Sequence, residues 1–373
     1  MPPLTVMIKP ASSLCNMACR YCFYLDEASH RWEDAPKLMS METMEKLVRK
    51  SMAYADGTVS FAFQGGEPTL EGLDYFRRFT AMVQSYNARR LPVHYAIQTN
   101  GLSLDREWAA FFAEHRFLVG VSLDGRQAEH DLYRVDRQGL GTYERVKNNL
   151  ALLREAQVDF NILTVVTKAV AEHPGEVFQA LRPYKFMQFI PCLDPMDGST
   201  HAYSITGAEY GQFLAKLFAL YEEAYFSQNP VSIRTFDNYV QMMMGYPPEH
   251  CGMAGVCGPF YAVEADGSVY PCDFYMLDEW RLGNIRETTF SRLDKLPLRQ
   301  AFLAASHPLP EECQSCSYLP LCHNGCKRDR QSPFADIPGQ NRLCEGYKLF
   351  FEACQPGLAR IAAAEDKRAR KNP

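Results

Sequence analysis

The sequence predicts an α/β fold in which a parallel sheet is followed by a loop-rich second part. As far as residue 195, short runs of β-branched and aromatic residues alternate with longer helical stretches. This alternation is typical of parallel strands joined by crossover helices. The strand candidates are almost continuously apolar, as expected for a sheet that is covered on both faces or curled into a barrel.

The expected strands are residues 4–9, 59–64, 94–99, 117–123, 160–166 and 186–191. Helical periodicity predicts helices at 41–54, 71–88, 105–114, 142–156, 174–182 and 207–226. Ser40 is the expected N-cap of the first helix. Polar segments follow five of the strands: a cysteine-rich loop, "QGGEP", "QTNG", "SLDG" and "PCLDP". Because the carboxyl ends of parallel strands meet at one edge, we expect these segments to converge on one mouth.

The pattern changes near residues 229–237, and from Cys251 onward the sequence is rich in loops. It contains one expected hairpin, which turns at Asp266–Gly267, and it closes with a helix at about 345–364. A region with so little regular periodicity needs another source of stability, which bound metal can supply. We therefore predict three parts: a barrel domain (1–230), a metal-binding domain (231–349) and a C-terminal helix with a basic tail (350–373).

Composition excludes several classes of protein. The 373 residues are 47% hydrophobic and 22% charged, with a formal net charge of -5. This balance is ordinary for a globular protein and argues against a general nucleic-acid binder, which needs a basic face. No apolar run is long enough to span a membrane, and the N-terminus lacks the apolar core of a signal peptide. We expect a cytoplasmic protein whose short basic ending is a solvated tail.

The thirteen cysteines are the most unusual feature of the composition. Disulfides do not persist in a reducing compartment, so clustered thiols there bind metal or carry out redox chemistry. Cys192 and Cys354 stand alone and are expected to be small buried hydrophobes. The other eleven form an N-terminal group of three and a later group of eight: Cys15, Cys19 and Cys22, then Cys251, Cys257, Cys272, Cys313, Cys316, Cys322, Cys326 and Cys344.

The N-terminal group has the spacing C-x3-C-x2-C and lies in the loop after the first strand. A purely structural zinc or iron-sulfur site has four protein ligands. Three thiolates leave one position open, so one iron of a four-iron cluster could bind a small molecule. The alternative is a zinc knuckle or a set of buried thiols.

This motif, with an aromatic residue before its last cysteine, resembles the signature of the radical S-adenosylmethionine (SAM) enzymes. The resemblance implies that the amino and carboxylate groups of SAM chelate the open iron, and that one electron then releases a 5'-deoxyadenosyl radical. It also implies cofactor contacts at Tyr21, Gly66, Ser122, Arg134 and Leu193. Glycine suits close approach of backbone to a ligand. For Arg134 a surface ion pair, and for Leu193 ordinary core packing, are the alternatives.

The later group resembles the SPASM extension, which carries two auxiliary 4Fe-4S clusters in enzymes that modify peptides and proteins. In that family's interleaved pattern, Cys251, Cys257, Cys272 and Cys326 would hold the first auxiliary cluster, and Cys313, Cys316, Cys322 and Cys344 the second. Each cluster would then hold the other in place, because Cys326 lies within the sequence run of the second set. Two zinc sites are the alternative, since four thiolates suit zinc equally well.

Nearly the whole chain resembles the anaerobic sulfatase-maturating enzymes, including "IKPASSLCN", "SFAFQGGEPTL", "FLVGVSLDG" and "DGSVYPCDFY". The resemblance implies a partial (β/α)6 TIM-like barrel followed by the SPASM domain. It implies oxidation of a cysteine or serine to Cα-formylglycine within a Cys/Ser-x-Pro-x-Arg motif of an unfolded or nascent sulfatase polypeptide. The expected electron donor is flavodoxin or ferredoxin. The choice between Cys and Ser stays open, because only the heteroatom differs.

After the adenosyl radical removes a hydrogen atom from Cβ, the substrate must lose one electron and one proton. Asp273, directly after Cys272, matches the family's proton acceptor, and a nearby anionic cluster should raise its pKa. A turn-fixing aspartate is the alternative. Asp278 fits less well, because it lies further from the ligand and is expected to be exposed. Weaker candidates, as contacts of the peptide, are Tyr24, Gln64, Gln98 and Asn100.

Two rival functions are considered. One is a SPASM maturase that crosslinks or modifies a ribosomal peptide. Such enzymes often carry a peptide-binding domain before the barrel, and only fourteen residues precede Cys15 here. The other is a non-catalytic zinc-binding module, which would be colourless, whereas an iron-sulfur protein is brown and oxygen-sensitive.

Overall fold

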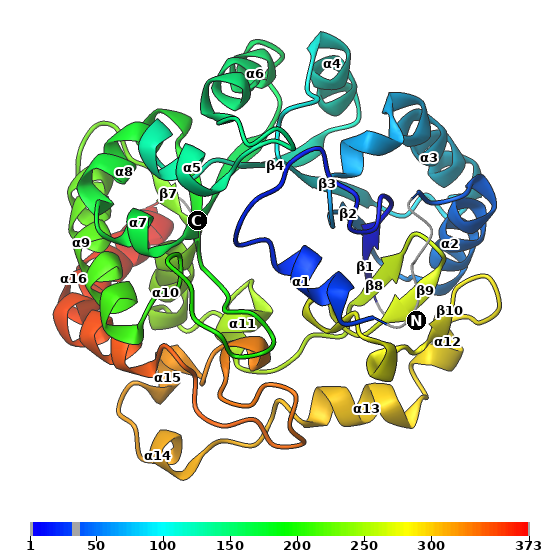
Figure 1. Ribbon diagram of the computed structural model, residues 1–373. Helices are drawn as coiled ribbons and strands as arrows, with labels where there is room; N and C mark the ends of the chain where they lie inside the picture. Colours follow the sequence, from blue (N-terminus) through cyan, green and yellow to red (C-terminus); the bar gives the residue numbers. More distant parts are fainter. Residues whose placement is uncertain (1–2, 32–37, 372–373) are drawn as a thin grey trace.

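One curved sheet organises the chain (Figure 1). The computed structural model describes residues 3–31 and 38–371. Among these residues, ten strands pair in the order β10-β9-β8-β1-β2-β3-β4-β5-β6-β7. Every pairing from β8 through β1 to β7 is parallel, whereas β9 and β10 are antiparallel to their neighbours. The predicted parallel α/β fold is confirmed.

All six predicted strands are present, within one or two residues of the expected bounds. They are β1 (Leu4–Lys9), β2 (Val59–Phe63), β3 (Val93–Thr99), β4 (Phe117–Ser122), β5 (Phe160–Val166) and β6 (Phe186–Pro191). The sequence pattern did not indicate β7 (Ser232–Ile233), which is too short to show a period. The remaining strands are β8 (Tyr261–Glu264), β9 (Ser268–Tyr270) and β10 (Gly283–Asn284).

The predicted helices are also present: α2 (Met41–Tyr54), α3 (Leu73–Tyr86), α4 (Arg106–Glu114), α6 (Tyr143–Glu155), α8 (Pro174–Leu181) and α9 (Gly207–Phe226). The Ser40 hydroxyl accepts a hydrogen bond from the Thr43 backbone N–H at 3.1 Å, which confirms the predicted cap. Sequence periodicity missed α1 (Phe23–Ser29), α5 (Gln127–Tyr133), α7 (Lys168–Ala171) and α10 (Arg234–Met243). Most of these are two turns or shorter.

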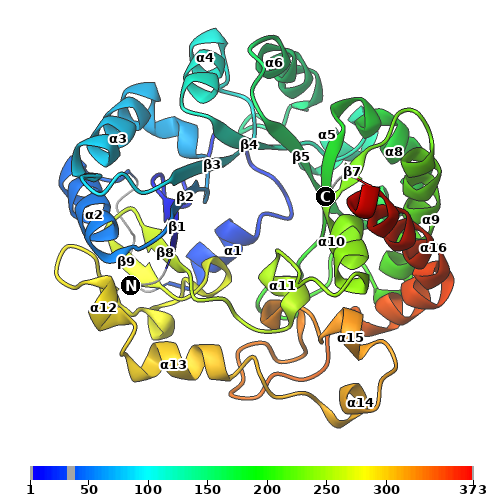
Figure 2. The same cartoon turned by 180° about the vertical axis from the view of Figure 1, so that it is seen from behind.

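The helices α2, α3, α4, α6 and α8 lie outside the curved sheet, while α1 lies within its curve (Figures 1 and 2). The outward strand residues and the helix faces share one apolar core, which includes Phe61, Phe63 and Phe117. Because the outer face is used for packing, polar groups that carry chemistry are left to the inner face and to the carboxyl ends of the strands.

The second part contributes directly to the same sheet. The hairpin of β8 and β9 turns at Asp266–Gly267 as predicted, with Gly267 at φ 87°. β8 pairs in parallel with β1, from Val6 opposite Tyr261 to Lys9 opposite Glu264. The sequence did not indicate this pairing, because nothing local specifies the partner of a four-residue strand. The domain bounds at 230 and 349 stay a prediction.

Short helices then carry the chain across the gap between the two edges of the sheet (Figure 1). They are α11 (Cys251–Ala254), α12 (Phe290–Leu293), α13 (Pro297–Ala304), α14 (Glu311–Gln314) and α15 (Leu319–Cys322), with the 3₁₀ turns η3 (Asp273–Tyr275), η4 (Asp278–Trp280) and η5 (Lys327–Asp329). The predicted loop-rich character of this region is confirmed. Two further 3₁₀ turns, η1 (Pro68–Glu71) and η2 (Arg182–Tyr184), belong to the barrel.

The closing helix α16 (Cys344–Lys371) is longer than predicted and includes most of the basic tail. Residues 367–370 are exposed, as expected of a solvated face, and the last two residues of the tail lie outside the described residues. Cys192 and Cys354 are both buried, as predicted. Among the described residues, none of the helices combines the length and apolar character needed to cross a membrane.

Helices α9 and α16 cross at three glycines. A Cβ on Gly346 would lie 2.1 Å from the Gly207 carbonyl oxygen, and a Cβ on Gly211 would lie 2.5 Å from the Gly346 carbonyl oxygen. Glycine is required here because backbone meets backbone. Since α16 begins at Cys344, this crossing also fixes one of the clustered thiols.

We predict that Gly346→Ala destabilises the protein by about 1–3 kcal/mol, the usual range for overpacking a close contact. The matched control is Gly175→Ala, also in the first turn of a helix, where an added Cβ meets nothing within 4 Å. That control should be neutral or gain up to about 1 kcal/mol. Anaerobic thermal unfolding measures both, and equal melting temperatures would contradict the proposed role of the crossing.

Candidate active site and cysteine clusters

The cysteine loop connects β1 to α1 and packs tightly on the loop after β2. Gly66 N–H donates to the Ser12 carbonyl at 2.7 Å, and Glu67 N–H donates to the Leu14 carbonyl at 2.8 Å. A Cβ on Gly66 would lie 2.1 Å from the Leu14 carbonyl oxygen. Glycine was predicted here for close approach to a ligand. The structure supplies another reason, which is close approach to the backbone of the cysteine loop.

The three thiols of this loop are near one another and largely enclosed. Burial raises the pKa of Cys15 to about 11 and that of Cys19 to about 12, and each is raised further by the charge of Cys22. Met17 N–H and Asn100 Nδ2 point at the Cys15 sulfur, at 3.3 and 3.5 Å. Ligation by Cys15 and Cys19 must therefore be coupled to proton release, because burial favours the protonated form of both thiols.

A buried carboxylate, Glu67, joins the loops after β2 and β3. It accepts four hydrogen bonds, from the Thr69 N–H and hydroxyl, the Thr99 hydroxyl and the Asn100 N–H, at 2.7–3.1 Å. Burial raises the pKa of Glu67, and these hydrogen bonds oppose the shift. Since Asn100 also reaches Cys15, the predicted convergence of strand ends is confirmed for the loops after β1, β2 and β3.

A second buried carboxylate, Asp124, follows β4. Arg134 Nε donates to its Oδ2 at 2.9 Å, and the Tyr21 hydroxyl donates to the same oxygen. The Arg134 guanidinium lies 5.4 Å from the Tyr21 ring centroid. Arg134 is only 7% exposed, so the alternative of a surface ion pair is wrong. Its positive charge lowers the pKa of Cys19, which burial otherwise raises.

The other two predicted cofactor contacts, Ser122 and Leu193, both follow or end barrel strands. Ser122 ends β4, two residues before Asp124, and is half-buried. Leu193 follows β6 beside the buried Cys192 and is also half-buried. Their contact with SAM stays a prediction.

Asp273 opens the 3₁₀ turn after β9 and is 7% exposed. Gln64 Nε2 lies 3.4 Å from one of its carboxylate oxygens, and the Cys272 sulfur lies 3.7 Å from the other. Tyr24 also hydrogen-bonds to it. Burial raises the pKa of Asp273, while the Lys9 ammonium acts most strongly in the opposite direction. A bond from its own backbone N–H keeps the turn-fixing interpretation compatible with the site.

A buried ion pair, Lys9–Glu27, lies next to the turn that carries Asp273. Lys9 and Glu27 are 2% and 1% exposed, and their charged atoms are 3.2 Å apart. The second Glu27 oxygen accepts from the Met276 N–H at 2.7 Å, and Lys9 Nζ lies 4.6 Å from the Tyr24 ring centroid. This pair therefore links β1, α1 and the turn that carries Asp273.

The weaker candidates for contacts with the peptide lie in different parts of the structure. Tyr24 and Gln64 meet at Asp273, whereas Asn100 follows β3 and contacts the cysteine loop, where it donates to Asn16 at 2.7 Å. Gln98 is exposed on β3. Asp278 was expected to be exposed, and this was wrong in degree, because it is half-buried in η4.

The eight later thiols gather in two places. The charges of Cys251 and Cys257 raise the pKa of Cys326, and those of Cys326 and Cys257 raise the pKa of Cys272, beyond the effect of burial. Cys251 and Cys257 interact in the same way. These four thiols, which we call the first set, are those that the interleaved pattern groups together.

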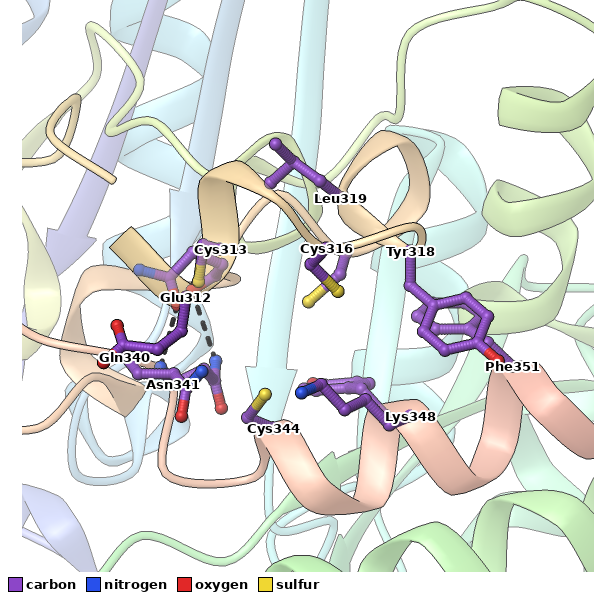
Figure 3. Close-up of a pocket in the computed structure, with 13 residues that line it drawn as sticks. Glu312, Cys313, Cys316, Tyr318, Leu319, Gln340, Asn341, Cys344, Lys348 and Phe351 are labelled. Atoms are coloured by element: carbon purple, nitrogen blue, oxygen red, sulfur yellow. Dashed lines mark hydrogen bonds between the residues drawn. The ribbon is translucent and has the colours of Figure 1, made fainter. Parts of the chain in front are cut away.

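The second set, Cys313, Cys316, Cys322 and Cys344, lines one small cavity. Figure 3 shows Cys313, Cys316 and Cys344 directed into this space from two chain segments far apart in sequence. Burial raises the pKa of Cys322 to about 11, and the other three thiolates add to the shift. Among the described residues, no three His, Cys, Asp or Glu side chains converge to hold a single metal ion.

Two donor groups near the first set fit an anionic occupant. Within the described residues, the buried Lys327 Nζ and Trp280 Nε1 have no hydrogen-bond acceptor. Both groups can only donate. Burial lowers the pKa of the Lys327 ammonium, and the thiolates of Cys257 and Cys272 oppose this shift.

Comparison with known proteins agrees with this geometry. Residues 10–181 match the radical SAM superfamily, and residues 257–317 match an iron-sulfur cluster-binding domain, SPASM. The chain is 41% identical to a cysteine-type anaerobic sulfatase-maturating enzyme of Clostridium novyi, over 94% of this chain and 95% of that protein. The chain belongs to the anaerobic sulfatase-maturating enzymes.

More distant and structural matches agree. A serine-type anaerobic sulfatase-maturating enzyme of Bacteroides thetaiotaomicron is 31% identical, over 95% of this chain and 90% of the relative. The solved structure of native anSMEcpe with bound AdoMet and Cp18Cys peptide superposes with a TM-score of 0.93 and 40% identity, covering 97% of this chain and 99% of that one.

Membership of the anaerobic sulfatase-maturating enzymes confirms the predicted fold of barrel and SPASM domain. It also confirms the cofactor classes, SAM and iron-sulfur clusters, and rules out the non-catalytic zinc module. Which residues hold each cofactor stays a prediction. Sequence reasoning missed Glu67, Asp124 and the Lys9–Glu27 pair, although a charged residue at or just after the end of an apolar strand is a signal that could have singled out Glu67, Asp124 and Lys9.

We predict that Lys9→Met destabilises this sulfatase-maturating enzyme by about 3–5 kcal/mol, because it leaves the Glu27 carboxylate buried without its partner. The double variant Lys9→Met/Glu27→Leu should recover most of the loss. Arg77→Ala, which breaks the exposed pair with Asp74, is the control and should cost at most about 1 kcal/mol. Thermal unfolding that shows equal losses in all three variants would contradict the role of the buried pair.

Proposed function

We propose that this chain oxidises a cysteine in a Cys-x-Pro-x-Arg motif of an unfolded or nascent sulfatase polypeptide to Cα-formylglycine. One observation carries the proposal. A buried carboxylate, Asp273, lies next to Cys272 of the first set and in contact with Gln64 and Tyr24 on the inner face of the barrel. This arrangement offers a proton acceptor beside a redox centre, which an oxidation of this kind requires.

The relatives favour cysteine over serine as the target. Those at 41% identity, from Clostridium novyi and Clostridium perfringens, are named cysteine-type. The serine-type relatives are 31% and 28% identical. Two of the similar solved structures are of native anSMEcpe with bound AdoMet and a peptide, Cp18Cys in one and Kp18Cys in the other.

We assign the cofactors to the thiol groups found together. Cys15, Cys19 and Cys22 hold the cluster that binds SAM, with Tyr21, Gly66, Ser122, Arg134 and Leu193 around the cofactor, and the first and second sets hold the auxiliary clusters. When bound, the SAM centre supplies a 5'-deoxyadenosyl radical that removes a hydrogen atom from the substrate Cβ. Both SAM and these thiolate-bound clusters need a site from which water is excluded, and the buried Arg134–Asp124 pair and Glu67 are consistent with one.

The chain's own residues complete the oxidation. The Asp273 carboxylate accepts the proton from the substrate sulfur as one electron leaves toward the first set. The product is a thioaldehyde, which takes up water and releases hydrogen sulfide to give the aldehyde. The Lys9 ammonium opposes the increase in the pKa of Asp273 that burial causes, while Gln64 and Tyr24 orient its carboxylate. We further propose that the electron donor is flavodoxin or ferredoxin and that the protein acts in the cytoplasm.

The test of the function uses reconstituted enzyme, SAM and a synthetic Cys-x-Pro-x-Arg peptide under anaerobic conditions. We expect mass spectrometry to show exchange of the thiol for an aldehyde in the wild type. Asp273→Asn should still cleave SAM and lose product by roughly 10²-fold or more, the lower range for a general base. The control Glu279→Gln removes an exposed carboxylate six residues further on and should retain product formation.

Wild-type rates of aldehyde formation in Asp273→Asn would refute the base assignment. Conversion of only the Ser peptide would refute the cysteine preference. Absence of aldehyde from both the Cys-x-Pro-x-Arg peptide and its Ser counterpart, with SAM cleavage intact, would refute the proposed substrate.

The metal content provides a separate prediction. Anaerobically reconstituted protein should bind about twelve iron atoms per chain, from three four-iron clusters. Cys316→Ala/Cys344→Ala should lose about four of these, because both residues belong to the second set. The control Cys354→Ala, at a lone buried cysteine, should keep the full content. A wild-type value near four would refute the assignment of both auxiliary clusters.

A further inference from the structure

Lys327 occupies an unusual position between the first thiol set and three aromatic rings. It follows Cys326 directly and is only 2% exposed. Its Nζ lies 4.9 Å from the ring centroid of Tyr275, 4.9 Å from that of Trp280 and 4.3 Å from that of Phe302. Rings at these distances are within the range of cation–π attraction, so they enclose the ammonium without neutralising it.

The protein supplies this ammonium with no carboxylate partner among the described residues. No ion pair of Lys327 occurs there, and its Nζ has no hydrogen-bond acceptor. The strongest favourable electrostatic interactions of Lys327 are with the thiolates of Cys257 and Cys272, ahead of the exposed Asp336. A buried charge needs compensation, and here the available negative charge is that of the first set.

Two other cations show why Lys327 is specific to the first set. Arg330 is buried as well, but its guanidinium donates to four backbone carbonyls and interacts with Cys257, Cys326 and also Cys313 of the second set. Lys348 lines the cavity of the second set and is exposed, so solvent and salt screen its charge. Of these three cations, Lys327 is the one whose charge is both buried and directed to one set.

We propose that Lys327 raises the reduction potential of the cluster held by Cys251, Cys257, Cys272 and Cys326, so that this cluster takes the electron that the substrate loses. The inference rests on the proposed function and deepens it. The substrate carbon radical gives one electron to the oxidised cluster and one proton to Asp273, and a carbon–sulfur double bond forms. The added electron makes the cluster more negative, and a fixed cation in a region of low dielectric stabilises that state.

The experiment is an EPR-monitored redox titration of reconstituted protein, which needs neither SAM nor peptide. Lys327→Met keeps the size and removes the charge. We expect the reduced state of the first-set cluster to become at least tenfold less favourable, a downward shift of about 59 mV for a one-electron couple. Lys327→Arg keeps the charge and should stay close to the wild type. Lys348→Met is the matched control and should leave the first-set potential unchanged.

The outcomes separate this inference from the proposed function. An unchanged first-set potential in Lys327→Met would overturn it, even if the enzyme still forms aldehyde. If Lys327→Met loses about four iron atoms per chain while Lys327→Arg keeps them, the charge is required and the inference is supported. If both variants lose the cluster equally, Lys327 acts through packing and the inference is wrong. A shifted potential in an enzyme that forms no aldehyde would instead refute the function alone.

Discussion

The parallel pairing of β8 with β1 is the constraint on which the site depends. β1 ends at the cysteine loop, so the strands that pair with its two edges determine which residues surround the three thiols. On one edge β2 brings Gly66 and Glu67 against that loop, and on the other edge β8 brings the hairpin after which Cys272 and Asp273 follow. A strand of four residues is a weak element alone. Inside a continuous sheet, however, it gains two neighbours and a fixed register, and a one-residue slip of β8 would move its own side chains, including Glu264, to the opposite face of the sheet.

The site is then completed by buried charges that hold one another. Glu67 is satisfied by backbone and hydroxyl donors, Asp124 by Arg134 and Tyr21, and Glu27 by Lys9 and the Met276 N–H. Burying a charge is costly unless it is paired and hydrogen-bonded. Each of these contacts joins different segments of the chain. The buried charges therefore lie where loops must be held at a fixed distance from one another. Asp273 differs, because the Lys9 ammonium that opposes its pKa increase also pairs with Glu27, and because Cys272 lies beside it. This difference supports its proposed role as the proton acceptor.

The sequence predicted most of the fold and the grouping of the cysteines. The physical reason for success differs between the fold and the cysteines. The barrel strands and helices are long enough for their apolar periods to show, and Ser40 and Gly267 have local requirements that residue type reveals. The thiols were found because their spacing carries the chemistry. Apart from β7 and the short helices α1, α5, α7 and α10, the missed features are non-local. Nothing near Lys9 indicates that Glu27 will face it, and nothing near Tyr261 indicates that β1 is its partner. The reason given for Gly66 was incomplete for the same cause, since Leu14 becomes its neighbour only after folding.

The interleaving of the two thiol sets makes metal binding and folding of the second part a single problem. Cys322 and Cys326 are separated by only three residues but belong to different sets. The buried Arg330 that follows donates to the carbonyls of Gly255, Ser306, Asn324 and Gly325. These carbonyls belong to three separate stretches of irregular chain, so Arg330 ties together segments that regular hydrogen bonding does not connect. Burial and neighbouring thiolates raise the pKa values of Cys272 and Cys326 in the first set and of Cys322 in the second, and four thiolates confined without metal would repel. Metal binding removes that repulsion, and its free energy therefore adds directly to the stability of this region. Because metal binding stabilises this region, the short helices between Cys251 and Cys344 need little intrinsic helix propensity. Their sequence accordingly shows little helical periodicity.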